Sequence, residues 1–318
     1  MTVHPFRFGI ITETFQDHCQ LRSLACRAEE LGYNTVLVRD HLAPAYFGPQ
    51  FAPLPTLAFL AGVTNTLRLG TMVLANDFRH PAILAKEAAT LDVLSAGRFE
   101  LGIGAGWLRD EYDRAGLAYD RNGLRIDRLE ESLQILKACF ASEEVTFAAR
   151  HYDLHRHQHF PAPIQFGGPP ILIGAGQPRM LRLAGKYADI VGLLTVSVGS
   201  GEMRDDIRAR KTAAVRAQID HVRAGSGERF EYIELSLVAD IEIADSSQKA
   251  VDDVITRHGW AEVTPADVRD MPGIFAGSVD EICELMMTRR WEIGISYYVL
   301  PDRLMDQCAP IVERLSGR

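Results

Sequence analysis

The stretch Arg68–Trp107, which reads RLGTMVLANDFRHPAILAKEAATLDVLSAGRFELGIGAGW, decides the fold because it forms a complete strand–helix–strand unit. Leu69–Leu74 and Phe99–Ile103 are nearly continuous apolar runs, as expected of strands buried on both faces, and such strands are parallel. Between them, apolar residues recur at helical spacing at positions 84, 88, 91 and 94. Pro81 suits the first turn of this helix and Gly97 its exit. The unit predicts a helix packed on a parallel sheet.

Length and composition indicate an ordinary globular enzyme. The chain has 318 residues, of which 47% are hydrophobic and 24% charged, and it carries a net charge of −8. This charge opposes nucleic-acid binding, which depends on neutralising phosphates. No apolar run is long enough to span a membrane, and the start MTVHPFRFGI lacks a secretory pattern, so we expect a cytoplasmic protein. Five scattered cysteines without a CxxC pair argue against a disulfide framework.

Strand-like runs recur along the whole chain, and amphipathic segments separate most of them. This pattern predicts a single domain, residues 1–318, folded as an α/β (β/α)₈ TIM barrel. We expect insertions after the second strand (Leu42–Pro55), between the fourth and fifth (Glu143–Pro170) and between the seventh and eighth (Asp245–Ser278). The predicted strands are Phe6–Ile11, Thr35–Val38, Leu69–Leu74, Phe99–Ile103, Ile171–Ile173, Ile190–Leu194, Ile233–Ile243 and Ile295–Leu300.

The residues that follow the strands are candidates for the site, because barrel active sites lie at the carboxyl ends of the strands. His41 follows the second strand, where its imidazole could exchange a proton while the carboxylate of Asp40 orients it. After the fifth strand, Gly174, Ala175, Gly176 and Gln177 precede a helix, and backbone N–H groups there suit a phosphate. Thr195 could add a hydroxyl to the same group. An ordinary helix cap and an ordinary strand–helix turn remain alternatives.

Motifs in order along nearly the whole chain resemble the luciferase-like superfamily of flavin- and deazaflavin-dependent oxidoreductases, and within it the actinobacterial branch that uses coenzyme F420. The matching segments are LGTMVLANDFRHPAILAKEAATLDVLSAGRFELGIGAGW, RLEESLQIL, VTFAARHYDL, PPILIGAGQPRMLRLAGKYADIVGL and GISYYVL. The resemblance implies a barrel that moves a hydride between C5 of the deazaflavin and a small organic substrate. Direction and substrate stay open.

The resemblance also implies roles for individual residues. The Asp40–His41 pair would lie at the deazaflavin ring, and the Met72–Val73 bond would be a non-prolyl cis peptide behind it. Asn76 would meet cofactor or substrate, whereas Arg79 and His80 fit a helix cap equally well. Ala105, Gly106 and Trp107 match the segment beside the pyrimidine edge of the ring. Sugar-phosphate dehydrogenases of the family carry a glutamate where this chain has Trp107, so their substrate should not be transferred.

Three other functions remain open. The same barrel with FMN in place of F420 could be a monooxygenase that uses reduced FMN and oxygen. A barrel that binds the cofactor without turning it over is another function that fits. A metal-dependent hydrolase is the fourth, because His151, His155, His157 and His159 fall within nine residues and the last three could share a strand face. These histidines lie in a segment that is a surface hairpin in the family, so we expect no metal. Homodimerisation through apolar helical faces such as Ala82, Ile83 and Ala89 is also expected.

Overall fold

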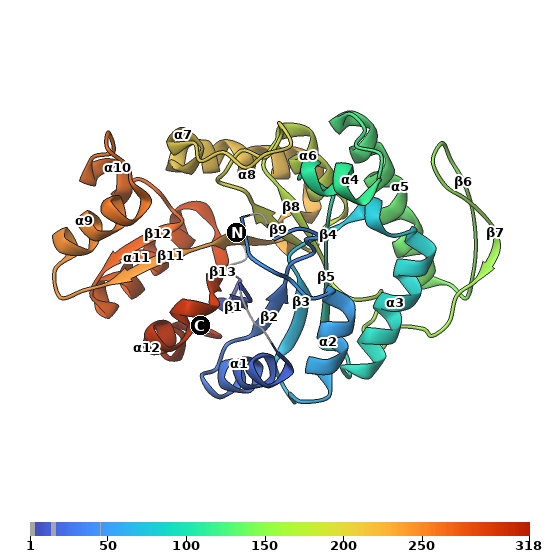
Figure 1. Ribbon diagram of the computed structural model, residues 1–318, viewed down its shortest axis with the longest axis horizontal. Coiled ribbons are helices and arrows are strands. Elements are labelled where there is room, and N and C mark those ends of the chain that lie inside the picture. The colour runs from blue at the N-terminus through green and yellow to red at the C-terminus, as the bar shows by residue number, and fades with distance from the viewer. Residues whose placement is uncertain (1–3, 14–16, 45) are drawn as a thin grey trace.

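Eight parallel strands, one of them in two pieces, form a closed barrel in the computed structural model, which describes residues 4–13, 17–44 and 46–318 (Figure 1). Each strand is hydrogen-bonded to the next, and the ring closes where Leu69 pairs with Phe99. Residues 1–3 of the amino-terminal stretch and Ala45 of the 42–55 connection lie outside the described residues. In order around the barrel the strands are β1 (Arg7–Ile11), β2 (Thr35–Val38), β3 (Arg68–Thr71) with β4 (Leu74–Ala75), β5 (Phe99–Gly104), β8 (Ile171–Ala175), β9 (Ile190–Leu193), β10 (Glu234–Val238) and β13 (Ile295–Pro301). The predicted barrel is confirmed.

The third barrel strand is interrupted between β3 and β4 by the Met72–Val73 peptide bond, which is cis as the resemblance implied. There the Thr71 side chain replaces the backbone ladder, because its Oγ1 donates to the Gly102 carbonyl at 2.7 Å and accepts from the Gly102 N–H at 2.9 Å. Position 102 must be glycine, since a Cβ would lie 1.8 Å from the Thr71 carbonyl oxygen.

Helices cover the outside of the barrel, and the main hydrophobic core lies between them and the strands. The larger helices show apolar faces toward the sheet, as in α5, where Leu129, Leu133 and Leu136 are buried. The helices are α1 (His18–Glu30), α2 (Pro53–Ala61), α3 (Pro81–Leu94), α4 (Arg109–Ala115), α5 (Asn122–Ala141), α6 (Pro178–Tyr187), α7 (Ile207–Arg210), α8 (Thr212–Ser226), α9 (Ser247–His258), α10 (Pro265–Arg269), α11 (Val279–Ile293) and α12 (Met305–Leu315), with short 3-10 helices at Asn76–Phe78, Gly227–Tyr232 and Asp302–Leu304.

Two of the expected connections carry more structure than the sequence indicated. The predicted strand Ile233–Ile243 was wrong as a single strand, because only β10 belongs to the barrel. β11 (Asp240–Ile243) leaves it and pairs in parallel with β12 (Ile274–Gly277). The connection 245–278 therefore holds α9, α10 and β12, which share a small separate core with Val251, Val254 and Met271. The 143–170 connection holds the antiparallel hairpin of β6 (Glu144–Ala148) and β7 (Asp153–Gln158), on the opposite side of the molecule (Figure 1).

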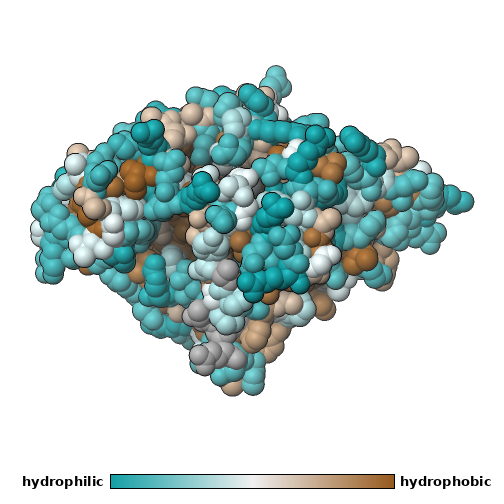
Figure 2. All heavy atoms as spheres, turned by 45° about the horizontal axis from the view of Figure 1, so that its top comes forward, coloured by the Kyte–Doolittle hydropathy of each residue, from teal (hydrophilic) through white to brown (hydrophobic). Residues whose placement is uncertain are grey.

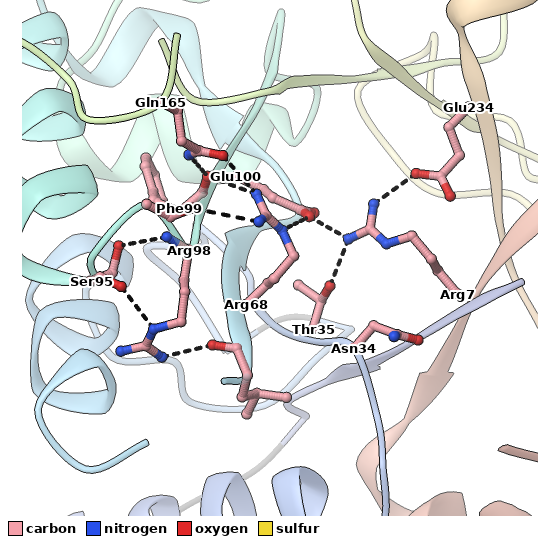
Figure 3. A network of polar contacts seen from close by, with 12 residues as sticks. Arg7, Asn34, Thr35, Arg68, Ser95, Arg98, Phe99, Glu100, Gln165 and Glu234 are labelled. Atoms are coloured by element: carbon pink, nitrogen blue, oxygen red, sulfur yellow. Dashed lines mark hydrogen bonds and ion pairs between the residues drawn. The ribbon is translucent and has the colours of Figure 1, made fainter. Parts of the chain in front are cut away.

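The interior of the barrel is apolar near the carboxyl ends of the strands and charged near the amino ends. Arg7 pairs with Glu100 and with Glu234, and Arg68 reaches the same Glu100 carboxylate (Figure 3). Burial raises the pKa of Glu234 to about 7, against the opposing effect of Arg7. The apolar layer above consists of Ile11, Leu37, Leu172, Ile190, Tyr297 and Val299, with Met72 and Val73 packed on it.

Helices α6 and α8 cross in direct backbone contact. A Cβ at Gly185 would lie 2.2 Å from the Val222 carbonyl oxygen, and one at Gly225 would lie 2.1 Å from that of Arg182. Only glycine at both positions permits this distance between the two helices.

The surface is mainly hydrophilic, with small separate apolar patches on the face that Figure 2 shows. Within the described ranges, no helix combines the length and apolar character needed to cross a bilayer. Of the three residues expected to support dimerisation, Ile83 is 58% exposed but Ala89 is fully buried in the barrel wall. Ala89 therefore cannot contact a second subunit, and the expected dimer itself stays a prediction.

Candidate active site

A cavity of about 760 Å³ opens at the carboxyl end of the barrel, where the sequence placed the site. Residues that follow seven of the barrel strands line it, and its volume lies in the range of small-molecule and cofactor sites. Of the residues predicted for the site, those that line this cavity are Asp40, His41, Met72, Val73, Ala105, Gly106, Trp107, Gly174, Ala175, Gly176, Gln177 and Thr195.

His41 is held by a buried carboxylate that the sequence analysis missed. Its Nδ1 lies 3.1 and 3.2 Å from the two carboxylate oxygens of Glu111, whose side chain is 3% exposed. The same carboxylate accepts from the backbone N–H groups of Leu42 (2.7 Å) and Ala43 (3.1 Å). An ionised Glu111 accepts hydrogen bonds only, so Nδ1 carries a proton and Nε2 is left to exchange one. None of the described residues hydrogen-bonds Nε2.

Two aromatic side chains fix the plane of the His41 ring and wall the cavity beside it. The ring of Phe47, from the 42–55 connection, lies 4.9 Å from the imidazole, and Trp107 meets it edge-on at 5.8 Å. Phe47 also covers the guanidinium of Arg39 at 4.0 Å. Burial lowers the pKa of Arg39 to about 10, against the effect of Glu13. The approach to His41 is thus mainly apolar.

Asp40 lines the cavity, but its oxygens are already engaged. Oδ2 accepts from the Ala75 N–H at 3.0 Å and from Arg79 Nη1 at 2.6 Å, while Oδ1 accepts from Arg79 Nη2 at 3.1 Å. This bidentate pair fastens the end of β2 to the segment after the cis bond. Asp40 does not touch His41 through any hydrogen bond in the described structure, so it acts as a positioning residue. Arg79 is therefore not a helix cap, whereas His80 is, since its Nδ1 accepts from the Ala82 N–H.

One wall of the cavity is nearly free of side chains around Val73. A Cβ at Gly104 would lie 2.9 Å from Val73 Cγ2, and one at Gly174 would lie 3.6 Å from the same atom. At Gly106, which has φ +73°, a Cβ would lie 2.0 Å from Tyr112 Oη. Met72 and Val73 thus form a shallow apolar bulge flanked by bare backbone, which suits the face of a planar ring.

A corner for an anion lies beside this wall. Gln177 precedes α6, and no side chain caps the first turn, so N–H groups there stay available in addition to the helix dipole. Across the cavity, Arg125 is 3% exposed and donates to the Gly106 carbonyl at 2.7 Å. Its Nε is buried with no partner among the described residues, and no described carboxylate forms an ion pair with it. A buried unpaired cation in this wall favours an anionic ligand.

Asn76 is the predicted site residue that does not line the cavity. It is buried in the 3-10 turn Asn76–Phe78, and its Nδ2 donates to Tyr152 Oη at 3.4 Å. The amide therefore faces the β6–β7 connection, away from His41.

The similarity of the chain to known proteins agrees with this geometry. Residues 1–292 match the model of the family described as luciferase-like monooxygenase. The chain belongs to the luciferase-like monooxygenase family. It is 30% identical, over 96% of its length and 94% of the relative, to an F420-dependent glucose-6-phosphate dehydrogenase of Microbacterium testaceum. It is 29% identical to a 4-hydroxyprotoasukamycin monooxygenase of Streptomyces nodosus subsp. asukaensis, over 73% of this chain and 60% of that one.

The fold is also that of solved structures of luciferase-like proteins. A coenzyme F420-dependent tetrahydromethanopterin reductase from Methanopyrus kandleri superposes with a TM-score of 0.76 at 17% identity, over 98% of this chain and all of the other. Luciferase-like relatives thus include dehydrogenases and monooxygenases, and this chain is an oxidoreductase of that family.

Glu111 and Arg125 were missed because they come from helices and not from strand ends. A signal was present in both cases. Glu111 shares a helical face with the buried Leu108, and Arg125 precedes the buried Leu129 by four residues. A charged side chain on the apolar face of a helix must find a polar partner or a ligand inside the luciferase-like barrel.

Proposed function

We propose that this protein is a coenzyme F420-dependent oxidoreductase that transfers a hydride between C5 of the deazaflavin and a small organic substrate. The observation that carries the proposal is that the bare wall around Met72–Val73 and the His41–Glu111 pair line the same cavity. The similarity over 96% of the chain to an F420-dependent dehydrogenase supports F420 as the cofactor. When bound, a deazaflavin supplies hydride transfer and disfavours oxygen activation.

The residues present fit such a cofactor. The Val73 bulge with Gly104 and Gly174 would support one face of the ring. The backbone of Gly174–Gln177 and the hydroxyl of Thr195 would hold a phosphate, and Arg125 would balance its charge. These roles need only groups that already line the cavity.

His41 would move the proton that accompanies hydride transfer. Glu111 keeps the Nδ1 proton in place and stabilises the imidazolium, so that Nε2 accepts or donates toward the cavity. Phe47 and Trp107 restrict water beside this nitrogen. Glu111 acts through His41 and is a positioning residue.

The substrate we propose is an uncharged organic molecule such as an activated alkene, imine, alcohol or carbonyl compound, and not a sugar phosphate. Trp107 and Phe47 present apolar surface beside His41. The arginines at the rim are already paired: Arg257 with Asp240 at 2.8 Å, Arg210 with Asp205 at 2.5 Å and Arg303 with Glu13 at 3.8 Å. None is therefore a ready ligand for a substrate phosphate, and we expect no turnover of glucose 6-phosphate.

The test is a parallel fluorescence titration of the purified protein with F420 and FMN, each oxidised and reduced. Tight binding of F420 with at least about tenfold weaker binding of FMN supports the proposal, and a screen of hydride acceptors and donors follows. His41→Gln should keep cofactor affinity within about threefold and lower turnover by about 100-fold or more. The matched control is His80→Gln, an exposed cap residue outside the cavity, which should leave turnover unchanged. Equal turnover in the two variants would remove His41 from the mechanism.

A second function, a monooxygenase that uses reduced FMN, is favoured by the similarity to the 4-hydroxyprotoasukamycin monooxygenase. Selective binding of FMN, with consumption of oxygen when reduced FMN and substrate are present, would establish it in place of the first. Tight binding of either cofactor with no turnover across the screen would favour a cofactor-binding protein instead.

A further inference from the structure

We infer that Cys139, His157 and His159 form a site for a divalent zinc-type cation, which fastens the β6–β7 hairpin to the carboxyl end of α5. One ligand atom from each residue lies within 4.8 Å of the others, although the cysteine is on a helix and the histidines are on and after a strand. This cluster is separate from the active-site cavity. Arg125, which lines the cavity from the same helix, precedes Cys139 by 14 residues or about 21 Å of helix.

A bulge in the hairpin separates His155 from His157 and His159. Simple alternation along β7 would place His155, His157 and His159 on one face. Instead, the register shifts between Val145 and Phe147, and Arg156 takes a positive φ of 45°. His155 consequently points outward, where it is 82% exposed and meets Asp153 at 3.2 Å. His157 and His159 turn inward toward α5.

Three of the four ring nitrogens of these two histidines are buried without a hydrogen-bond partner among the described residues. His159 is 7% exposed, and neither of its ring nitrogens has a partner among the described residues. The buried Nε2 of His157 likewise has none within the described part of the chain. Each unpaired buried polar group costs about 1–3 kcal/mol of free energy of folding. A metal ion would remove this cost, because it binds imidazole nitrogens and a thiolate together.

The composition and dimensions fit zinc. Thiolate sulfur and imidazole nitrogen are both ligands that zinc takes, and a water molecule would complete the tetrahedral coordination of the three side chains. Tetrahedral coordination requires ligand atoms about 3.3 to 3.7 Å apart, so the three side chains have to close by about 1 Å, which rotamer changes on a hairpin can supply. A cysteine binds a metal as the thiolate, so the Cys139 thiol gives its proton to solvent as the sulfur–metal bond forms.

The hairpin already has one polar anchor on α5. The carboxylate of Glu131 accepts from the backbone N–H groups of Arg150, His151 and Tyr152 at the hairpin turn. Cys139 lies two helical turns further along the same helix, beside the base of the hairpin, where the His159 N–H donates to the Glu143 carbonyl at 2.7 Å. A metal would thus fix the base of the hairpin, as Glu131 fixes the turn, and its role would be structural.

The experiment uses the full untagged chain, stripped with a chelator, and titrates it with zinc against a chromophoric competitor and separately with cobalt. We expect one equivalent of zinc, and a near-ultraviolet thiolate-to-cobalt charge-transfer band. Zinc at a hundredfold excess over its Kd should raise Tm by about 4 °C for a chain of 318 residues. Absence of stoichiometric zinc binding or of the charge-transfer band would overturn the inference.

Variants separate this site from adventitious binding by exposed histidines. Cys139→Ser and His157→Gln should each abolish the band and weaken zinc binding at least about 100-fold, while His155→Gln on the same strand should change it less than about threefold. His157 is only partly buried, so His157→Gln still gives a test if Cys139→Ser does not fold. An equal loss in His155→Gln would show that zinc binds the outer face of the hairpin and would refute the site. Cofactor binding should not depend on zinc in any variant.

Discussion

The ion pair between Asp40 and Arg79 should be one of the strongest single polar contacts in the molecule, and a double-mutant cycle can measure it. Asp40→Ala, Arg79→Ala and the double variant would be compared with the wild type. The Asp40 side chain is 3% exposed and that of Arg79 is 21% exposed, and two parallel N–H···O bonds join them. Either single substitution leaves one buried charged group without its partner.

The expected magnitudes follow from this geometry. Breaking a fully buried pair costs about 3–5 kcal/mol, and the partial exposure of Arg79 reduces this to about 3 kcal/mol for either single variant. With about 2.1 cal/mol/K of unfolding entropy per residue, a chain of 318 residues should lose about 4–5 °C of Tm. The coupling energy should be about 2 kcal/mol, because the double variant no longer contains an unpaired charge.

Reversible urea denaturation monitored by circular dichroism would give the free energies of unfolding. The control cycle is Glu144 and Arg156, a pair on the hairpin at 3.1 Å with an 81% exposed arginine, where we expect a coupling close to zero. A coupling between Asp40 and Arg79 below about 0.5 kcal/mol would refute the view that this pair holds β2 to the segment after the cis bond. F420 affinity should fall in both single variants, because Ala75 and Val73 belong to that segment.

Three further predictions concern carboxylates. Glu111→Gln should lower turnover by about 10–1,000-fold in a steady-state assay with an accepted substrate and leave the F420 Kd within threefold, since the carboxylate contacts His41 and the backbone of Leu42 and Ala43. A larger change in Kd would contradict a role that is confined to this segment. Burial raises the folded-state pKa of Glu234 from 4.5 to about 7, so its contribution to stability is present below pH 4.5 and is lost as the pH rises to 7. Glu234→Gln should flatten the pH dependence of the unfolding free energy, measured in urea between pH 5 and 8, by on the order of 2–3 kcal/mol. An unchanged pH profile would refute this role of Glu234. Burial opposes ionisation of Glu29, but the backbone N–H groups of Thr66, Leu67 and Asn65 lower its pKa to about 2. The resulting stability is present above pH 4.5 and is lost as the pH falls toward 2, so the unfolding free energy of Glu29→Gln should fall less steeply with acid than that of the wild type. Equal slopes in denaturation experiments at low pH would contradict the contact.

The barrel could be predicted from the sequence because its strands are buried on both faces. Runs such as Leu69–Leu74 are nearly continuously apolar, as in parallel sheets that are covered on both faces, and eight strand-like runs along the chain favour the barrel. The run Ile233–Ile243 instead alternates apolar and polar residues along much of its length. It is predicted as one strand, yet it splits, because the sequence does not reveal which neighbour each half will pair with. β11 finds its partner β12 some thirty residues later, and both are four residues long.

The helices α9 and α10 were missed for different reasons. In α9 the buried Ala250, Val251 and Val254 follow helical spacing, so the signal was present. The five residues of α10 are too few to show any period. Short elements of this kind are set by tertiary contacts and not by local preference.

The strand-end rule located the wall of the active site but not its chemistry. His41 and Gly174 follow predicted strands and were found in this way, and Met72–Val73 came from the family resemblance. The contact of His41 with Glu111, in contrast, spans 70 residues. Single-sequence reasoning has no measure of such distances. Asn76 was predicted to line the site because it follows a strand, but the 3-10 turn after β4 directs its amide toward Tyr152.

The crossing of α6 and α8 has a consequence for how this architecture can change. The N–H groups that suit a phosphate begin at Gln177, at the head of α6, while Gly185 and Gly225 set how far the body of that helix stands from its neighbour. A methyl group at either glycine would push α6 aside as a rigid rod, and the head of the helix would move with it. The glycine crossing thus ties the end of the cavity beside Gln177 to the outer helix layer of the protein. Substitutions at Gly185 or Gly225, which do not line the cavity, would alter its shape as much as changes in its wall.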